Sequence, residues 1–592
     1  MTDWKDTMWR HALPFVQTPG QYVGGEWNMA RKDPSAVALR FCLAFPDTYG
    51  VGMSHEGLQV LYGVLNARDD VYAERAFAPW GDMEERLRAR EIPLCSIETR
   101  TPLREFDVIG FSLQYEMCLT NVLNMLELGG IPLLASERRA DDPIIVAGGP
   151  CAYNPEPMAD FVDLFVIGDG EERILDLADA CIALKRERPD TRDELLCRLI
   201  ERVPNSYAPA LYETDANQPV RPRSGLPVEP PTIIEPAVVA DLDAAFAPER
   251  PIVPFVEAVH DRISIEIMRG CGRGCRFCRA GMTRRPVRRR SVERIVSLCE
   301  AQYAATGHSA ISLSSLSSSD YPELPRLLRE LTARFSERKV SVSLPSLRVN
   351  EQLREMPGLI GGVRKSALTI APEAATERLR RVINKRISDA DLRSGVEAAF
   401  AQGWNHVKLY FMVGLPTETD EDVRAIAGKA EEISLLRRGG GKGPARVNLS
   451  VATFVPKPHT PFQWEAMVSV ERMRELRAML RGALRRRSVQ LKFHDPERSW
   501  LEGVFARGDR RLGRVLLEAH RLGCRFDAWK ETFDFALWQR AFETCGTDGA
   551  AYANRERDAD EALPWSHIRA HVSPELLRRE RERALRGEYA PD

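Results

Sequence analysis

The sequence lacks any long hydrophobic run. Hydrophobic residues make up 44% of its 592 residues, yet no apolar stretch approaches the roughly 20 residues that a membrane-spanning helix needs. The first residues, MTDWKDTMWRHALPF, include two acidic side chains and no long apolar core, so we expect no signal peptide. We therefore expect a cytoplasmic protein with no membrane partner.

The sequence also has little net charge. It carries 83 basic and 85 acidic residues, a net charge of −2, which gives no overall signal for nucleic-acid binding. Two local basic runs stand out, at residues 284–290 and 481–487. The second is typical of a solvated helix face. The first directly follows a cysteine motif, and it leaves contact with the phosphates of an RNA substrate open.

No repeat with a period of 20–50 residues is present, which excludes solenoids and propellers. Residues 1–215 instead alternate between strand-like and helix-like runs. Strand-like runs cover 37–45, 106–113, 143–150 and 161–172. This alternation predicts an α/β fold with a Rossmann-like parallel sheet, in which ligands bind at the carboxyl ends of the strands.

The rest of the chain divides into three parts. Residues 216–254 hold nine prolines and read as a linker or strap between domains. A second strand–helix series over 255–470 predicts a partial (β/α)6 TIM barrel. Its strand-like runs cover 262–270, 310–316, 340–345, 366–373, 406–414 and 446–456. Residues 471–592 are mostly helical in pattern. In barrels the working residues lie at the carboxyl ends of strands.

Three of the twelve cysteines are clustered, in the run RGCGRGCRFCRAG after the first barrel strand. Cys271, Cys275 and Cys278 can hold three corners of an iron–sulfur cube and leave one iron with an open position. Structural zinc, with His260 or His308 as a further ligand, is an alternative. A non-catalytic iron–sulfur carrier or redox regulator is another, although such a protein normally supplies a fourth ligand, which this motif lacks.

The C-x3-C-x2-C spacing, with Phe277 before the last cysteine, resembles the signature of the radical S-adenosylmethionine (radical SAM) superfamily. The resemblance implies a [4Fe-4S] cluster whose open iron binds S-adenosylmethionine (SAM). One electron, from a donor such as flavodoxin or ferredoxin, then cleaves SAM to methionine and a 5′-deoxyadenosyl radical. It also implies a radical SAM core barrel over residues 255–470.

The same resemblance implies that SAM lies at the other strand ends of the barrel. Arg348 then pairs with the SAM carboxylate, Glu373 lies near the ribose and Gly414 lies beside the adenine. The alternatives are a surface ion pair for Arg348, a helix cap for Glu373 and a structural turn for Gly414. Ser315, Ser318 and Asp320 are weak candidates, because the Gly-Gly-Glu-like stretch usual at this position of the superfamily is absent. The full set of SAM candidates is Phe277, Ser315, Ser346, Arg348, Glu373 and Gly414.

The N-terminal domain resembles the cobalamin-binding domain of B12-type radical SAM proteins. Such domains usually carry Asp-x-His-x-x-Gly after the first strand. Here the loop reads GMSHEGLQVLY, with His55 in place but Met53 at the aspartate position and Gly57 one residue early. One interpretation is a cobalamin-binding domain; the other is a degenerate domain that packs on the barrel, with His55 at a helix start. In the first case glycine turns line the cofactor, at Gly148, Gly149, Gly168 and Gly170.

The resemblance extends over residues 24–28, 45–58, 110–126, 147–161 and 259–282. It indicates the uncharacterised B12-binding-domain radical SAM proteins, often paired with a small radical SAM-linked protein. We therefore expect an enzyme that activates a C–H bond of an unknown substrate held between barrel and N-terminal domain. With cobalamin, methyl transfer is the expected reaction. RNA modification by the same radical chemistry is the alternative.

Overall fold

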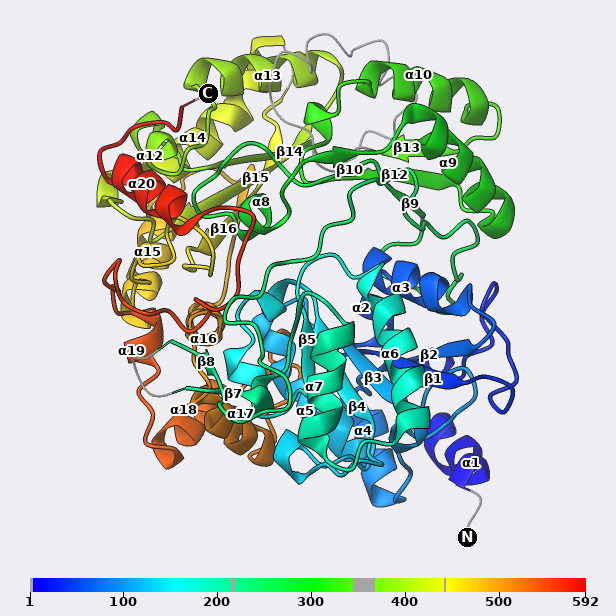
Figure 1. The fold of residues 1–592 in the computed structure, drawn as a ribbon. Coiled ribbons are helices and arrows are strands. Elements are labelled where there is room, and N and C mark those ends of the chain that lie inside the picture. The colour runs from blue at the N-terminus through cyan, green and yellow to red at the C-terminus, as the bar shows by residue number, and fades with distance from the viewer. Residues whose placement is uncertain (1–3, 215–218, 344–367, 441–442, 592) are drawn as a thin grey trace.

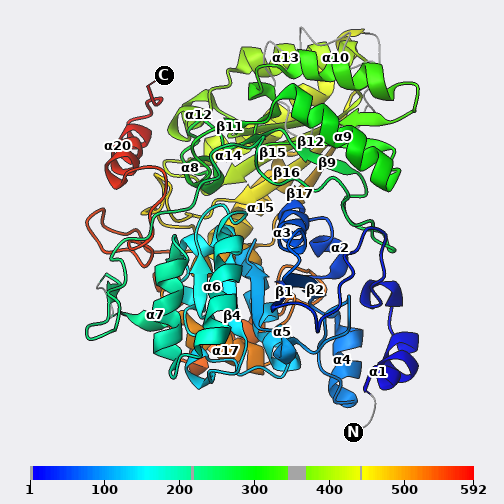
Figure 2. The same cartoon turned by 45° about the vertical axis from the view of Figure 1, so that its right-hand side comes forward.

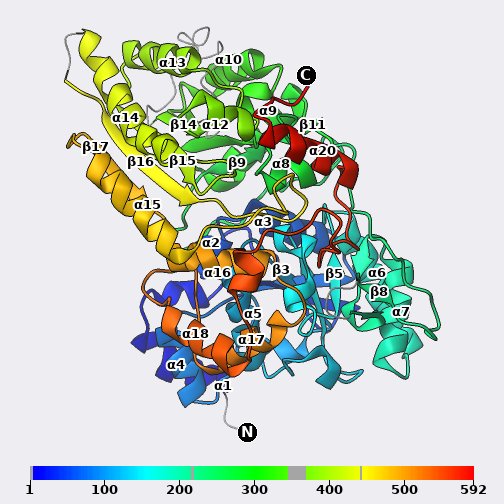
Figure 3. The same cartoon turned by 90° about the vertical axis from the view of Figure 1, so that its left-hand side faces the viewer.

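The structure is a computed structural model of the chain, and it describes residues 4–214, 219–343, 368–440 and 443–591. Two units built on parallel sheets lie one above the other in Figure 1, the N-terminal unit below and the barrel above. The C-terminal helices run along one side of both units, as Figure 3 shows from that side.

The N-terminal unit is built on a six-stranded sheet with the order β2-β1-β3-β4-β5-β6. The first five strands are parallel and β6 runs antiparallel to β5. Helices α6 and α7 lie in front of this sheet in Figure 1. The expected Rossmann-like sheet is confirmed. Its strands are β1 (Leu39–Phe45), β2 (Val71–Phe77), β3 (Val108–Ser112), β4 (Ile144–Gly148), β5 (Leu164–Val166) and β6 (Ser206–Tyr207). Its helices include α3 (Glu56–Asn66), α4 (Gly81–Ala89), α5 (Leu119–Leu128), α6 (Arg173–Glu187) and α7 (Arg192–Arg202).

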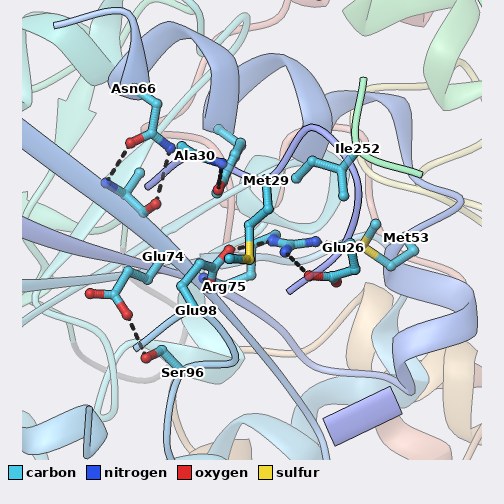
Figure 4. A network of polar contacts seen from close by, with 12 residues as sticks. Glu26, Met29, Ala30, Met53, Asn66, Glu74, Arg75, Ser96, Glu98 and Ile252 are labelled. Carbon is cyan, nitrogen blue, oxygen red and sulfur yellow. Dashed lines mark hydrogen bonds and ion pairs between the residues drawn. The ribbon is translucent and has the colours of Figure 1, made fainter. Parts of the chain in front are cut away.

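Strand β2 was not predicted, because two charged residues interrupt its apolar pattern. Both are fully buried in the structure. Arg75 lies between two carboxylates, with Nη2 at 3.0 Å from Glu26 and Nε at 2.6 Å from Glu98 (Figure 4). Glu74 accepts a hydrogen bond of 2.6 Å from Ser96. A buried charge is tolerated only when it is paired in this way, and the partners come from loops far along the chain.

The barrel unit consists of two parallel sheets in the described residues, β13-β12-β9 and β14-β15-β16-β17. Helices pack on their outer faces and share one apolar core with them. The strands are β9 (Ile263–Glu266), β12 (Ala310–Ser314), β13 (Ser341–Ser343), β14 (Leu368–Glu373), β15 (His406–Val413), β16 (Arg446–Thr453) and β17 (Val489–Phe493). The covering helices include α9 (Val292–Thr306), α10 (Leu324–Phe335), α13 (Asp389–Ala401), α14 (Asp420–Leu436) and α15 (Val470–Ala483).

Strand β17 lies beyond residue 470, where we expected the barrel to end. It pairs in parallel with β16 over five residues, so the sheet continues into the part expected to be helical. Strand β17 was not predicted, because its short run, VQLKF, mixes apolar and polar residues. Burial of only one face of the strand produces such a mixture.

The C-terminal helices bridge the two units. Helix α17 (Leu512–Arg521) packs on α5 and joins the apolar core of the N-terminal unit. Helix α20 (Pro574–Leu585) lies beside α12 (Glu377–Val382) of the barrel, as Figures 1 and 3 show. Helix α16 (Pro496–Ala506) precedes α17, and α18 (Phe535–Thr544) and α19 (Ala550–Ala553) come between α17 and α20 in the chain.

The proline-rich segment forms a strap against both units. Ala237 forms a parallel bridge with Gly168, Ile234 with Ile568, and Val253 an antiparallel bridge with Trp27. Figure 2 shows the strap and the N-terminal helices from another side. Among the described residues, no helix is both long enough and apolar enough to cross a membrane.

Candidate functional site

The three clustered cysteines lie on one loop between strand β10 (Met268–Arg269) and helix α8 (Arg279–Thr283). The loop is closed at its base because β10 pairs with β11 (Arg288–Arg289). Gly270 begins it with φ +88°, and a Cβ there would lie 2.3 Å from the carbonyl oxygen of Arg284. Only glycine fits this close approach without strain.

The cysteine side chains are partly exposed and lie near one another. Burial, and then the neighbouring Cys275 thiol, raise the pKa of Cys278 to about 11, and Cys271 adds to this. The Sγ atom of Cys278 accepts a hydrogen bond of 3.3 Å from Gly281 N and so begins helix α8. Three thiols on one loop, open on one side, fit a cluster that takes one thiolate at each of three irons.

A single-ion site is not formed in the described part of the chain, where no three His, Cys, Asp or Glu side chains are grouped to hold one metal ion. The histidines considered for zinc have other surroundings. His308 Nδ1 lies 3.3 Å from Asp261, and the backbone N–H of His260 donates to Ser54. The zinc alternative therefore has no geometric support.

The cysteine loop is held from below by a turn that follows α12. The amide of Asn384 donates to the carbonyl oxygens of Arg273 and Gly274, at 3.3 and 3.0 Å. Arg276 is fully buried and forms an ion pair of 2.9 Å with Glu580 of α20. Its guanidinium also donates to the carbonyl of Glu588. The C-terminal segment thus helps to shape the loop.

The N-terminal unit reaches the same loop through a buried ion network. Arg279, which follows the last cysteine, lies 3.0 Å from Glu116, and Lys457 lies 2.8 Å from the other oxygen of Glu116. Lys457 also pairs with Glu502 at 2.8 Å. Burial alone would raise the pKa of Glu116, but the two cations outweigh it and lower that pKa to about 2. Glu116 therefore stays ionised at neutral pH.

Three predicted SAM contacts lie at strand ends. Ser315 follows β12 and its Oγ lies 2.9 Å from Ser318 Oγ. Glu373 ends β14 with φ +67°, and Lys385 Nζ lies 3.7 Å from its carboxylate. Gly414 follows β15 with φ +79° and donates to Glu418 at 2.7 Å. Parallel strands bring their carboxyl ends to one edge of a sheet, so these positions share the edge of the cysteine loop.

The remaining barrel candidates differ in their surroundings. Phe277 packs on an apolar cluster that includes Leu415 and Phe454, together with Met412. Asp320 forms an ion pair with Arg273 of the cysteine loop, its Oδ2 atom 2.8 Å from Nε. Ser346 and Arg348 lie outside the described residues.

The predicted cobalamin residues lie at the carboxyl edge of the N-terminal sheet. His55 caps α3, accepting a hydrogen bond of 3.1 Å at Nδ1 from Leu58 N. Burial lowers the pKa of His55 to about 4. Gly168 has φ +102°, and a Cβ there would lie 2.4 Å from the backbone of Ala237 in the strap. A Cβ built at each of the other three glycines would lie 2.8 to 3.5 Å from the nearest main-chain or side-chain atom. These glycines are Gly148, Gly149 and Gly170.

This carboxyl edge is docked directly on the barrel. The hydroxyl of Tyr153, after β4, donates to the carbonyl of Thr283, and His459 Nε2 lies 2.8 Å from the carbonyl oxygen of Tyr153. A cavity left between Glu116, Cys151 and Arg279 measures about 10 Å³, which is room for about one water molecule. This cavity has no room for a corrin ring, and neither His55 nor any of the four glycines lines it.

The basic run at 284–290 is largely internal. Arg288 is buried and pairs with Asp169, and Arg290 is buried and donates to the carbonyl of Glu266. Arg284 lies 3.4 Å from Asp169. Among these arginines Arg289 is exposed. The expectation that this run contacts RNA phosphates is not supported, because its charge is used between the domains.

Sequence reasoning missed several site residues. Glu116, Lys457 and Glu502 join in one network although they lie on three distant segments. The available signal was a lysine inside the proline-rich run FVPKPH after β16, where a charge is unusual. Lys385, which lies beside Glu373, had no distinguishing signal in the sequence.

Two family models match the chain, one in each unit. The family model described as "Radical SAM proteins, N-terminal" matches residues 57–209, and the model "Radical SAM superfamily" matches residues 265–430. An uncharacterised protein of Methanocaldococcus jannaschii is 28% identical over 423 residues, which cover 71% of this chain and 82% of that protein.

Two solved structures are similar at low identity. One is the radical SAM methyltransferase TsrM of Kitasatospora setae with cobalamin and a [4Fe-4S] cluster bound, at 15% identity and a TM-score of 0.48, covering 73% of this chain and 78% of that one. The other is the cobalamin-dependent SAM radical enzyme OxsB with aqua-cobalamin and SAM bound, at 11% identity and a TM-score of 0.47, covering 92% and 78%.

Proposed function

Since the chain belongs to the radical SAM superfamily, whose enzymes use a [4Fe-4S] cluster and SAM, we propose that it activates a C–H bond of its substrate. The proposal assigns the cluster to Cys271, Cys275 and Cys278. The observation that carries it is the placement of three thiols on one loop at the carboxyl edge of the barrel strands. Three ligands leave the fourth iron free for SAM.

When bound, the cluster supplies the electron that cleaves SAM. The chain's own groups hold and shield it. Arg276 and Asn384 fix the loop from below, and Arg279 ties it to the N-terminal unit. The apolar cluster around Phe277 keeps water away from one side of the loop. Exclusion of water protects a radical from side reactions.

The strand ends supply the groups that we propose for SAM. The Glu373 carboxylate can accept hydrogen bonds from hydroxyl groups, and Ser315 can approach an amino acid moiety closely because it is small. Gly414 leaves the backbone open beside a flat ring. Ser346 and Arg348 stay in the proposed set on sequence grounds alone.

Cobalamin-assisted methyl transfer is a second candidate. The strand order β2-β1-β3-β4-β5 has its switch point between β1 and β3, where ligands of such sheets bind. Two features of this arrangement argue against the cofactor: the carboxyl edge rests on the barrel, and His55 caps helix α3 through Nδ1. We therefore derive no step through cobalamin. Co-elution of hydroxocobalamin with the full chain in gel filtration would support this candidate, and its absence would remove it.

An external electron donor is required by any radical SAM enzyme. A flavodoxin or ferredoxin, and a small radical SAM-linked protein, are the partners we propose. RNA modification loses most of the observation that favoured it, because Arg284 and Arg288 of the basic run pair with Asp169 of the N-terminal unit.

Anaerobic reconstitution tests the main proposal. The full chain should take up about four irons and form 5′-deoxyadenosine when SAM and dithionite are added. Changing Cys271, Cys275 and Cys278 together to Ala should abolish both. Cys545→Ala is a matched control, because this thiol is also partly exposed but lies far from the loop in sequence. Reductive SAM cleavage by the triple variant would refute the proposal.

A further inference from the structure

The inner face of strand β15 carries side chains that a packed barrel core would not. On the outer face of β15, Val407, Leu409 and Phe411 are buried against the covering helices. Between them Lys408 and Tyr410 point to the other face and are exposed, Tyr410 by 41%. Barrel interiors are normally filled by branched apolar side chains, so this face is available to a ligand.

The strand register places the inner side chains of β15, β16 and β17 beside one another. Tyr410 pairs with Ser450, and Ser450 with Lys492. In the row before, Lys408 pairs with Asn448. Adjacent strands lie about 4.8 Å apart, so Tyr410 and Lys492 stand about 10 Å apart across the small Ser450.

This inner face begins at the cysteine loop. Met412 is the next inward residue of β15, and it packs on the same apolar cluster as Phe277 of the cysteine motif. Two strand residues span about 7 Å, so Tyr410 lies about 7 Å and Lys408 about 13 Å from Met412 along the strand. A molecule on this face therefore has one end near the cluster.

The charge of the face is positive. Strands β15, β16 and β17 contain no Asp or Glu. Lys408 and Lys492 form no ion pair or hydrogen bond with any other residue in the described ranges. Arg446 adds a third cation and donates to Gln490 at 3.1 Å. The side-chain oxygen of Asn448 is buried and has no hydrogen-bond partner within the described part of the chain.

On the opposite half of the barrel, the inner side of β9 carries negative charge. Glu56, at the start of α3, contacts Ser264 on the inner side of β9. Glu266 is engaged by Arg269, with 2.8 Å between Nη2 and the carboxylate. The β9 side thus carries two acidic groups, Glu56 from the N-terminal unit and Glu266 from β9 itself, whereas β15–β17 carry none.

Resting on the radical SAM function above, we propose that the inner face of β15–β17 binds the substrate, and that the substrate bears an anionic group beside a planar ring. Lys408 and Lys492 bind the anion, a phosphate or a carboxylate, and Tyr410 stacks on the ring. Lysine binds either anion as a compact point charge. An exposed aromatic side chain offers a face for offset stacking.

Lysine acetylation tests the proposal in the full reconstituted chain with SAM present and no reductant, so that the SAM site is filled. The probes are phenyl phosphate, benzoate and the neutral benzamide. At about ten times its Kd, an anionic probe should slow acetylation of Lys408 and Lys492 about tenfold. Lys530, which is exposed on the C-terminal region, should react unchanged. Tyr410→Ala should weaken the protection, and Lys530→Gln should leave it intact.

Each result decides a specific point. Protection by phenyl phosphate or by benzoate supports the site and identifies the preferred anion. Equal protection by benzamide, no protection by either anion, or equal slowing of Lys530 overturns it. Adding dithionite to the same preparation tests the radical SAM function separately through 5′-deoxyadenosine. Protection without cleavage would refute the enzyme function and keep the anion site, and cleavage without protection would do the reverse.

Discussion

Arg279 and Glu116 lie 3.0 Å apart across the boundary between the barrel and the N-terminal unit. Arg279 directly follows the third cysteine of the loop, and Glu116 belongs to the loop after β3. Their ion pair makes the position of the cysteine loop depend on the domain contact.

Glu116→Gln should loosen the cysteine loop. It leaves Arg279 and Lys457 buried without their shared carboxylate, and breaking a buried pair in this way costs about 3–5 kcal/mol. The unfolding temperature should fall, and the iron retained after gel filtration should drop. Glu187→Gln is a control, since Glu187 pairs with Arg198 and Arg202 inside the N-terminal unit, far from the cysteines in sequence. Unchanged iron content and unfolding temperature in Glu116→Gln would contradict the role.

His55→Ala and His55→Asn separate a helix cap from a cobalt ligand. Asparagine caps helices well, whereas alanine loses the cap at a cost of about 1 kcal/mol. If His55 acts only as the cap of α3, His55→Asn should match the wild type in thermal unfolding and His55→Ala should not. Absorption spectra with hydroxocobalamin provide the second readout. A cobalamin spectrum that changes equally in both variants would show ligation instead.

Arg288→Gln should destabilise the fold and leave RNA affinity unchanged. Arg288 is buried against Asp169 and the carbonyl of Val239. Its loss removes the shortest of the three arginine contacts of Asp169 and takes a hydrogen-bond donor from the buried Val239 carbonyl. Arg289→Gln is the matched control, since Arg289 is exposed. Thermal unfolding and filter binding of transfer RNA at several salt concentrations are the measurements. Normal unfolding of Arg288→Gln together with weaker, less salt-dependent RNA binding would reverse our interpretation.

Acid should destabilise the protein partly through His567. Burial, and then Arg510, lower the pKa of His567 to about 3. The nearby Glu156, at 3.6 Å, is already engaged by Arg510 and by the hydroxyl of Tyr207, and the ring of Tyr212 packs alongside. The folded state therefore holds a neutral ring that the unfolded chain protonates below a pKa of about 6.5.

The sign follows from this difference. The contribution of His567 is complete above pH 6.5 and is lost by about 1.4 kcal/mol for each pH unit as the pH falls from there towards 3. Urea unfolding between pH 8 and pH 4.5 measures it. His567→Phe should flatten the curve below pH 6.5 and run parallel to the wild type above pH 7. Parallel curves over the whole range would show that His567 does not contribute.

Much of the fold could be predicted from the sequence because the patterns are local. Buried strands such as β4 are continuous apolar runs, β1 is apolar except for Arg40, and the helices between them have regular spacing. The cysteine loop could be predicted because its ligands lie within eight residues. Strands β2 and β17 could not, because Arg75 owes its burial to two distant carboxylates and β17 buries one face only.

The sequence by itself determined the three thiols and the chemistry that they imply, because coordination depends on residue type and close spacing. Only the tertiary structure decided what the other charged groups do. Arg288, which looked available to a phosphate, pairs with Asp169, and His55 caps a helix. Lys408 and Lys492 lie 84 residues apart and come to one open face through strand register. Such pairings depend on contacts between distant segments, and no local pattern encodes them.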